Sequence, residues 1–310
     1  MDRELWKSIL DAIRQAARRV GWCGGQRQPV YPNRQIVAMY LWCVWHDRPL
    51  CWGCLPGSYG RLFRPGKLPS GSQFTRRIKS DDCQQILQFV HDSFAQRGLC
   101  SELGYIDGKP LLVSPVSKDR QATRGRICGG FAKGYKLHAM VNQQRRIVVW
   151  SVMGLNVDEK TVAREAILPN LPEMTPTALL LADSHYDSAP LHKEVADPLG
   201  IGLLHPLSGQ QAISGEQGHL SRTLRQMGAT RRELVALWKH RPDLMKFIMK
   251  SRIQIESVFG VLSCTAGGLA SALPSWVRTL DRVTRWVGGK IIFYNARVQL
   301  LETRQPIAAA

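Results

Sequence analysis

The sequence lacks any long apolar run. No stretch approaches the roughly 18 consecutive apolar residues that a membrane-spanning helix needs. The first ten residues, MDRELWKSIL, also lack the apolar central region of a signal peptide. We therefore expect a soluble chain that is not exported and has no membrane partner.

Acidic side chains are also scarce. The 310 residues include 24 Asp and Glu against 42 Lys and Arg, a formal net charge of +18. The excess is concentrated at the front, because residues 1–80 hold 14 basic and 4 acidic side chains, a net +10 that leaves +8 for the rest. Basic side chains that neutralise phosphates release condensed counterions, so a nucleic acid is the expected partner. The alternative is that the charge only aids solubility.

The eight cysteines are scattered, and in a chain that is not exported we expect no disulfides. Four potential zinc ligands fall within a twelve-residue stretch: Cys43, His46, Cys51 and Cys54. Their spacing is not typical of a zinc site, and the nearby Trp52, Leu55 and Pro56 are typical of helix packing. Both interpretations of this stretch are kept open.

The first hundred residues are predicted to form an all-α domain. Helices are expected over 5–20, 32–46 and 82–98. Between the second and third of these come a turn-rich link, WGCLPGSYG, and then a short helix. Ser70 or Ser72 would cap this short helix, whose polar face carries Arg76, Arg77 and Lys79. Such a set is similar to a helix-turn-helix, whose second helix reads a major groove, although the same charges could be a solvated face.

From residue 101 the pattern changes to strands. Strands are predicted over 103–113, 134–142, 146–154, 178–182 and 200–207, the second and third as a hairpin, with residues 114–126 as a polar loop. Helices are predicted from a cap at Asn156 or Asp158 to Leu168, from a cap at Asp187 or Ser188 to about Ala196, and over 247–263. This order predicts an α/β fold: a ribonuclease H-like mixed five-stranded sheet with helices on both faces.

Three acidic residues occupy positions from which they could converge. Asp183 ends the buried strand 178–182, at the edge where α/β proteins bind ligands. Asp107 interrupts the strand 103–113, and Glu256 lies on the helix 247–263, four residues after Arg252. Three carboxylates that meet can hold two divalent cations about 4 Å apart and catalyse displacement at a phosphodiester.

Four segments carry a family resemblance: YIDG, KGYKLHAMV, LLLADSHYDS and SRIQIESVFG. In this order they resemble the catalytic core of bacterial DDE transposases, the insertion-sequence transposases of groups four and five. The resemblance covers roughly residues 101–300, and IIFYNARVQL resembles the closing helix of that family. WGCLP followed by PSGSQFTRR resembles its N-terminal DNA-binding region.

The resemblance implies both a site and an activity. Asp107, Asp183 and Glu256 become the catalytic and metal-binding triad, holding two Mg²⁺ ions for which Mn²⁺ could substitute. The implied activity is phosphoryl transfer on double-stranded DNA, with binding of terminal inverted repeats and transfer into target DNA. The implied assembly is a homodimer on DNA, in the cytoplasm and associated with the nucleoid.

The signature around the third carboxylate is partly present. In the family, a Tyr is followed three residues later by an Arg, four residues after that by a Glu, and seven residues after the Glu by a Lys. Arg252 and Glu256 match this pattern, whereas Met249 and Ser263 stand at the positions of the Tyr and the Lys. These replacements leave open a catalytically inactive, domesticated DNA-binding protein. A second alternative is a structure-directed nuclease on the same fold, which would not need the N-terminal DNA-binding region.

Further site residues are expected around this core. The expected DNA contacts are Arg252, Lys250, Arg76, Arg77, Lys79 and Lys136. His138 and His185 either assist near the metals or have structural roles. The catalytic domain is expected over 101–310, with a short, mainly helical insertion at about 208–245. Within the insertion Trp238 either holds a base or joins Leu234, Val235 and Leu237 in an apolar helix face.

Overall fold

The computed structural model describes residues 2–21, 30–95, 102–171, 179–206 and 228–304. Contacts between residues divide the chain into two compact units. The first unit joins residues 1–96 to residues 261–310, and the second consists of residues 97–260. Each unit is described by itself.

The described helices of the first unit lie close to their predicted positions. They are α1 (Arg3–Val20), α2 (Asn33–Trp45), α3 (Gly71–Ile78), α4 (Asp81–Ala95) and α13 (Leu280–Arg304). Ser70 is the cap of α3, and it forms a reciprocal capping box with Gln73. The turn-rich link contains two 3₁₀ turns, Trp52–Cys54 and Pro56–Ser58. The predicted helices of residues 1–95 are thereby confirmed.

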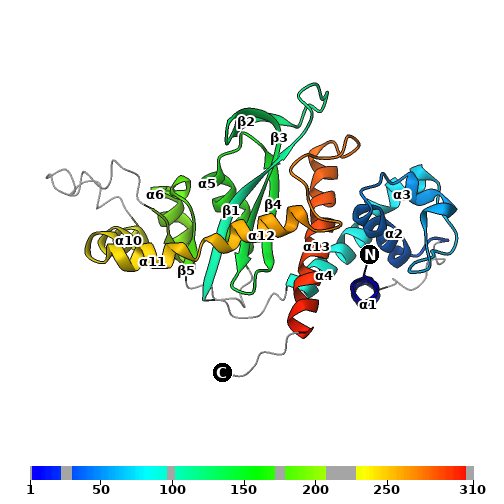
Figure 1. Ribbon diagram of the computed structural model, residues 1–310, viewed down its shortest axis with the longest axis horizontal. Coiled ribbons are helices and arrows are strands. Elements are labelled where there is room, and N and C mark those ends of the chain that lie inside the picture. The colour runs from blue at the N-terminus through cyan, green and yellow to red at the C-terminus, as the bar shows by residue number, and fades with distance from the viewer. Residues whose placement is uncertain (1, 22–29, 96–101, 172–178, 207–227, 305–310) are drawn as a thin grey trace. The chain divides into compact units, whose positions relative to one another are not determined.

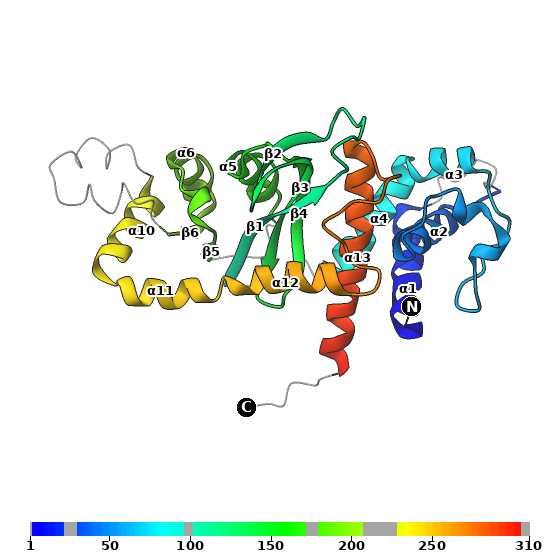
Figure 2. The same ribbon diagram turned by 45° about the horizontal axis from the view of Figure 1, so that its top comes forward.

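The core of the first unit is built from helix faces. Leu5, Ile9 and Ile13 repeat at helical spacing on α1 and are buried, whereas α2 is buried over its whole second half. The long α13 packs against α1, α2 and α4 (Figure 2). Gly289 permits this approach, because a Cβ there would lie 3.0 Å from the Val44 side chain.

The assignment of residues 261–310 is the main difference from the predicted organisation. The sequence placed them in the catalytic domain, whereas their contacts group them with the N-terminal helices. The boundary between the units, after Gly260, falls within the residues of α12 (Ile253–Cys264). The predicted functional division near residue 100 stays a prediction.

The second unit is organised by one mixed sheet. Its strands are β1 (Leu103–Leu112), β2 (Thr123–Ile127), β3 (Gly130–Asn142), β4 (Ile147–Gly154), β5 (Leu179–Leu181) and β6 (Gly202–Leu204). β3 pairs antiparallel with β1, β2 and β4, and the parallel strands β5 and β6 follow on the other side of β1. Gly134 pairs with both Leu112 and Thr123, so β2 and β4 share one edge of β3.

The sheet has six strands, and the prediction of five was wrong because β2 was taken as part of a polar loop. The sequence of β2, TRGRI, has no apolar alternation, and only Gly125 within it is buried. A Cβ at Gly125 would lie 2.5 Å from the Leu155 carbonyl oxygen. β2 therefore depends on the absence of a side chain, which a hydrophobic pattern does not record.

Short helices follow β4 and β5. α5 (Glu159–Val162) continues through a π turn (Ala163–Ile167) and a 3₁₀ turn (Leu168–Asn170). α6 (Ala189–Leu191) leads through a π turn into α7 (Asp197–Leu199), which ends at Gly200 with a positive φ. The predicted helices are confirmed here. The prediction that helices cover both faces of the sheet stays a prediction.

The described part of the insertion is helical, with α10 (Ala229–His240) and α11 (Pro242–Lys250). Its remainder, residues 208–227, lies outside the described residues. Within the described ranges, no helix combines the length and apolarity that a membrane crossing requires.

Candidate active site

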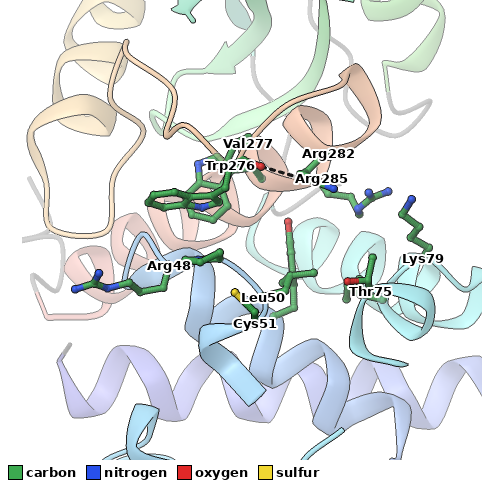
Figure 3. A pocket seen from close by; sticks show the side chains of 13 residues that line it. Arg48, Leu50, Cys51, Thr75, Lys79, Trp276, Val277, Arg282 and Arg285 are labelled. Carbon is green, nitrogen blue, oxygen red and sulfur yellow. Dashed lines mark hydrogen bonds between the residues drawn. The ribbon is translucent and has the colours of Figure 1, made fainter. Parts of the chain in front are cut away.

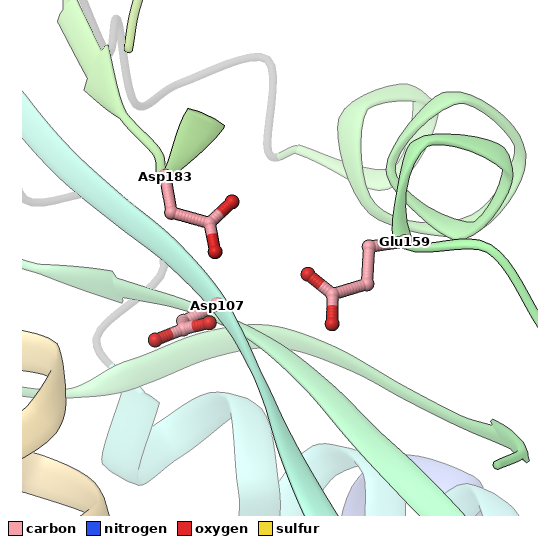
Figure 4. Close-up of side chains that lie close together, drawn as sticks. All are labelled: Asp107, Glu159 and Asp183. Carbon is pink, nitrogen blue, oxygen red and sulfur yellow. The ribbon is translucent and has the colours of Figure 1, made fainter. Parts of the chain in front are cut away.

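Two of the predicted carboxylates are brought together by parallel pairing. β1 pairs with β5 in the register Tyr105 to Leu181, so Asp107 and Asp183 each lie two residues beyond this last pair. The short strand β5 ends at Leu181, so its carboxyl end lies beside the middle of β1. The expectation that Asp107 and Asp183 lie close together is confirmed by their convergence there (Figure 4).

A third carboxylate, Glu159, was missed by the sequence analysis. It is the first residue of α5, directly after Asp158, whose side chain caps the helix by accepting from the Lys160 amide. Gly108 leaves room for it, because a Cβ at that position would lie 3.0 Å from Glu159 Oε1. Lys136 Nζ donates to the same oxygen at 2.8 Å, which holds the side chain in place.

Asp107, Glu159 and Asp183 form a compact set of oxygen donors. One carboxylate oxygen from each lies within 4.8 Å of those of the other two (Figure 4). Glu159 Oε2 is buried and accepts no hydrogen bond from any described residue. An all-carboxylate donor set fits hard cations such as Mg²⁺, and the orphaned oxygen is a vacant ligand position for one. The three residues can therefore hold a divalent cation.

The negative charge of the three carboxylates is only partly balanced by neighbouring positive groups. The pKa of Asp107 is raised to about 6, mainly by burial, and the negative charges of Glu159 and Asp183 contribute to the rise. The guanidinium of Arg252 and the amide of Gly108, which donates to Asp107 Oδ1 at 2.7 Å, oppose the rise. A bound cation would supply the missing positive charge.

The predicted third carboxylate, Glu256, lies outside this set of three. Its side chain is 59% exposed, and it accepts from Arg252 Nη1 at 3.0 Å. Arg252 Nη2 donates to Asp107 Oδ2 at 2.7 Å, so one guanidinium separates Glu256 from the cluster. The prediction of one helix over 247–263 was wrong, because a turn at Ser251 and Arg252 divides it into α11 and α12 (Ile253–Cys264). Arg252 therefore lies just before the helix that carries Glu256, and the two still form an ion pair.

The two candidate accessory histidines have different environments. His185 is exposed, and its Nδ1 lies 3.0 Å from Asp183 Oδ2, while its amide donates to Asp183 Oδ1. His138 is buried on β3 opposite Gly108, and neither ring nitrogen has a hydrogen-bond partner. Burial lowers the pKa of His138 to about 3, which keeps it neutral. Only His185 contacts a carboxylate of the cluster.

A second group that the sequence analysis missed is the hydroxyl of Tyr186. The residue is fully buried in the 3₁₀ turn after Asp183, and its hydroxyl has no hydrogen-bond partner. Burial raises the pKa of this phenol, and the charges of Glu159 and Asp107 add to the rise. The Tyr186 hydroxyl is therefore a polar group without a partner among the described residues, and the negative charges of the carboxylate cluster act on it.

The predicted DNA contacts of the second unit differ in availability. Lys136 forms the ion pair with Glu159 and is half-buried. Lys250 is exposed at the end of α11. Trp238 donates its indole N–H to the His205 carbonyl at 2.9 Å, and Leu234 beside it is buried. These contacts favour the apolar-face interpretation of Trp238.

In the first unit, the three predicted contacts on and after α3 also differ. Arg76 is exposed, and Lys79 is exposed next to Asp281, 3.8 Å away. Arg77 is half-buried and donates to the Tyr31 carbonyl and to Asn33 Oδ1. Arg77 therefore ties α3 to the start of α2.

The alternative zinc site does not assemble in the described ranges. There, the one set of three or more His, Cys, Asp or Glu side chains close enough to hold a metal is the carboxylate cluster. Cys43 is buried, Cys54 donates to the Leu50 carbonyl, and His46 contacts the rings of Trp42 and Trp52.

Comparison with protein families matches residues 98–296 to the family described as Transposase DDE domain. No curated protein matches the chain. The matched stretch is more than half of the chain and includes Asp107, Glu159, Asp183 and Glu256. A DDE domain is ribonuclease H-like, in agreement with the mixed sheet, in which Asp107 lies on β1 and Asp183 follows β5. The chain therefore belongs to the transposase DDE domain family.

Proposed function

We propose that the protein is a DNA transposase of the bacterial insertion-sequence groups four and five, which binds terminal inverted repeats and performs strand cleavage and strand transfer. The observation that carries the proposal is the convergence of Asp107, Glu159 and Asp183 within 4.8 Å in a chain of the DDE family. The net charge of +18 supports a polyanionic substrate.

The proposed cofactor is a pair of Mg²⁺ ions, with Mn²⁺ as a substitute. Asp107, Asp183 and Glu159 would hold the first ion, and Glu256 would complete the ligands of the second. Two such ions supply activation of the attacking oxygen and stabilisation of the leaving oxygen in an in-line displacement at a phosphodiester. Carboxylate oxygens suit both ions. Because water or a 3′-hydroxyl would be the attacking group, no covalent protein nucleophile is needed.

Arg252 has a proposed part in substrate positioning. Its guanidinium contacts Asp107 and Glu256, and a backbone phosphate of bound DNA would compete for its N–H donors. Lys250, exposed at the end of α11, would contact the same DNA. His185 would keep the Asp183 carboxylate oriented through their contact at 3.0 Å.

Recognition of the transposon ends is proposed for residues 1–100, whose first 80 residues carry a net charge of +10. Arg76 and Lys79 offer exposed cations on and after α3, whereas Arg77 supports that helix. Coordinated cutting of two ends requires two active sites, so we propose a homodimer on DNA whose two-fold symmetry matches the inverted repeats. The proposed place of action is the nucleoid in the cytoplasm.

Cleavage assays on DNA that carries the terminal repeats of the element test this function. Nicking at the repeat ends in Mg²⁺ or Mn²⁺, with joining to target DNA, is the expected result. Binding without nicking would instead identify a domesticated DNA-binding protein, as the replacements Met249 and Ser263 allow. Cutting of branched DNA irrespective of its sequence would identify a structure-directed nuclease.

A further inference from the structure

The first unit contains a basic recess distant in sequence from the carboxylate cluster. It is a cavity of about 210 Å³ (Figure 3). Its wall comes from the end of α2 and the segment after it, from α3, and from the start of α13 with the segment before it. Nothing in the chemistry of Asp107, Glu159 and Asp183 uses this recess.

The recess joins apolar walls to a cationic rim. Trp276, Trp286 and Leu50 contribute apolar surface, while Arg48, Lys79 and Arg282 contribute positive charge. Among the residues that line it there is no carboxylate. The nearest acidic partner in the described contacts is Asp281, which pairs with Arg285 and lies 3.8 Å from Lys79.

This combination selects for a ligand with a flat apolar part and an anionic part. Aromatic and apolar walls stack planar rings, and guanidinium or ammonium groups hold phosphates. The indole N–H of Trp276 is itself buried and has no hydrogen-bond acceptor among the described residues, so the aromatic face, not this N–H, is the part that a ligand would contact. Arg282 donates to the Trp276 carbonyl at 2.9 Å, which ties the segment carrying this indole to α13.

The volume of the recess limits the bound part of the ligand to about one nucleotide. Sites for drug-sized ligands usually measure about 300–1,000 Å³, so 210 Å³ suits a single ring system. A base stacked within a duplex cannot present its faces to a concave site, whereas an unpaired base can enter one.

We propose that this recess binds one nucleotide of an unpaired DNA strand, with the base against Trp276 and its phosphate on Arg48, Lys79 and Arg282. The proposal rests on the proposed function, since it presumes that DNA is the substrate. Lys79 directly follows α3, so the recess lies at the end of the helix proposed to contact duplex DNA. Unpaired nucleotides beside a paired end would thus be captured by the same unit.

The test compares fluorescence anisotropy of a labelled 20-nucleotide oligothymidylate with that of a random-sequence duplex of equal length, using the full chain. Trp276→Ala is expected to weaken binding of the oligothymidylate by roughly 5- to 150-fold, the range for loss of one stacked base, and to leave duplex binding within about twofold. Trp276→Phe, which keeps an aromatic face, should retain most of the affinity for the single strand.

The matched charge control uses two arginines of the same unit. Arg48→Gln should weaken binding of the oligothymidylate more than Arg18→Gln, because Arg18 is exposed on α1 outside the recess. Equal effects of the two changes would mean that only net charge matters, and would overturn the proposal. Unaltered binding by Trp276→Ala would overturn it as well.

Three further outcomes separate this proposal from others. Titration with thymidine monophosphate distinguishes a free nucleotide as ligand: binding as tight as that of the oligothymidylate would overturn the assignment to a DNA strand. If wild type binds neither DNA, the proposed function fails together with this inference. If wild type binds only the duplex, the inference alone fails.

Discussion

Arg252 forms an ion pair with Asp107, and its Nη2 lies 2.7 Å from Asp107 Oδ2. The two residues are separated by 145 positions, and the pair joins the segment preceding α12 to the middle of β1. Because the same guanidinium also binds Glu256, it partly neutralises the site. The pKa of Asp107 is nevertheless raised, to about 6, so this compensation is incomplete.

The first prediction concerns Asp107→Asn in the cation-free protein. The Asp107 pKa is about 6 in the folded chain and 3.8 ordinarily, so the folded state binds this proton more tightly. The free energy of unfolding of the wild type therefore falls as the pH rises from about 4 to about 6 and beyond, because Asp107 loses its proton. The asparagine side chain of the variant does not titrate, so the variant does not show this fall. Relative to wild type, the variant should gain up to about 3 kcal/mol in free energy of unfolding between about pH 4 and pH 7.

Urea denaturation at the two pH values, with a chelator present, measures this difference. The control is Asp243→Asn, because Asp243 has a side chain that is 99% exposed and should change stability little at either pH. A gap between Asp107→Asn and wild type that stays constant or shrinks with rising pH would contradict the account.

The second prediction separates Glu159 from Glu256. Glu159→Gln should weaken binding of the first Mn²⁺ by more than the roughly tenfold that loss of a supporting contact costs, because Glu159 belongs to the convergent set. Glu256→Gln should leave that affinity nearly unchanged while it lowers the rate of strand cleavage. Titration calorimetry with Mn²⁺ measures the first effect.

The control for these variants is Glu165→Gln, whose side chain is 60% exposed in the turn after α5. The opposite pattern, with first-ion binding lost in Glu256→Gln and retained in Glu159→Gln, would restore the triad of Asp107, Asp183 and Glu256 and remove Glu159 from the site.

The third prediction concerns Tyr186→Phe. The hydroxyl is buried without a partner, which is costly, so its removal should leave the cation-free chain as stable as wild type or up to about 1 kcal/mol more stable. Tyr135→Phe is the matched control: that hydroxyl donates to Asp119 Oδ2 at 2.7 Å, and its loss should destabilise by about 1 kcal/mol. Equal destabilisation of both variants in urea denaturation would refute the assignment of an unpaired hydroxyl.

The fourth prediction distinguishes neighbouring arginines of α3. Arg77→Ala should lower the free energy of unfolding by about 1–3 kcal/mol, since it removes hydrogen bonds to the Tyr31 carbonyl and Asn33. Arg76→Ala should leave stability within about 0.5 kcal/mol, as expected for an exposed position, and weaken duplex binding in a salt-dependent way. Thermal denaturation measures the stability of the two variants, and duplex binding at two salt concentrations measures their affinity for DNA. Equal stability of the two variants would contradict the structural role of Arg77.

Much of the fold was predictable because it depends on local patterns. The buried run before Asp183, the capping Ser70 and the apolar spacing of α1 each mark an element from neighbouring residues alone. The convergence of Asp107 and Asp183 also followed, since both lie at strand positions that parallel pairing brings together.

Glu159 was not predictable in the same way. Its position depends on where the chain returns after β4 and on the space above Gly108, which are properties of tertiary packing. The available signal was modest: the sequence offered Asn156 or Asp158 as a helix cap, and Glu159 directly follows the second of these. β2 was missed for a related reason: it depends on the close approach of Gly125 to the Leu155 backbone, which only a residue without a side chain allows.

Strand cleavage by Asp183→Ala tests the central claim most directly. With Mg²⁺ or Mn²⁺ and DNA carrying the terminal repeats, the variant should lose nicking entirely, because one of three convergent carboxylates is removed. Its binding to the same DNA should remain close to wild type, since end recognition is assigned to residues 1–100. Nicking by Asp183→Ala at a rate comparable to wild type would contradict the account.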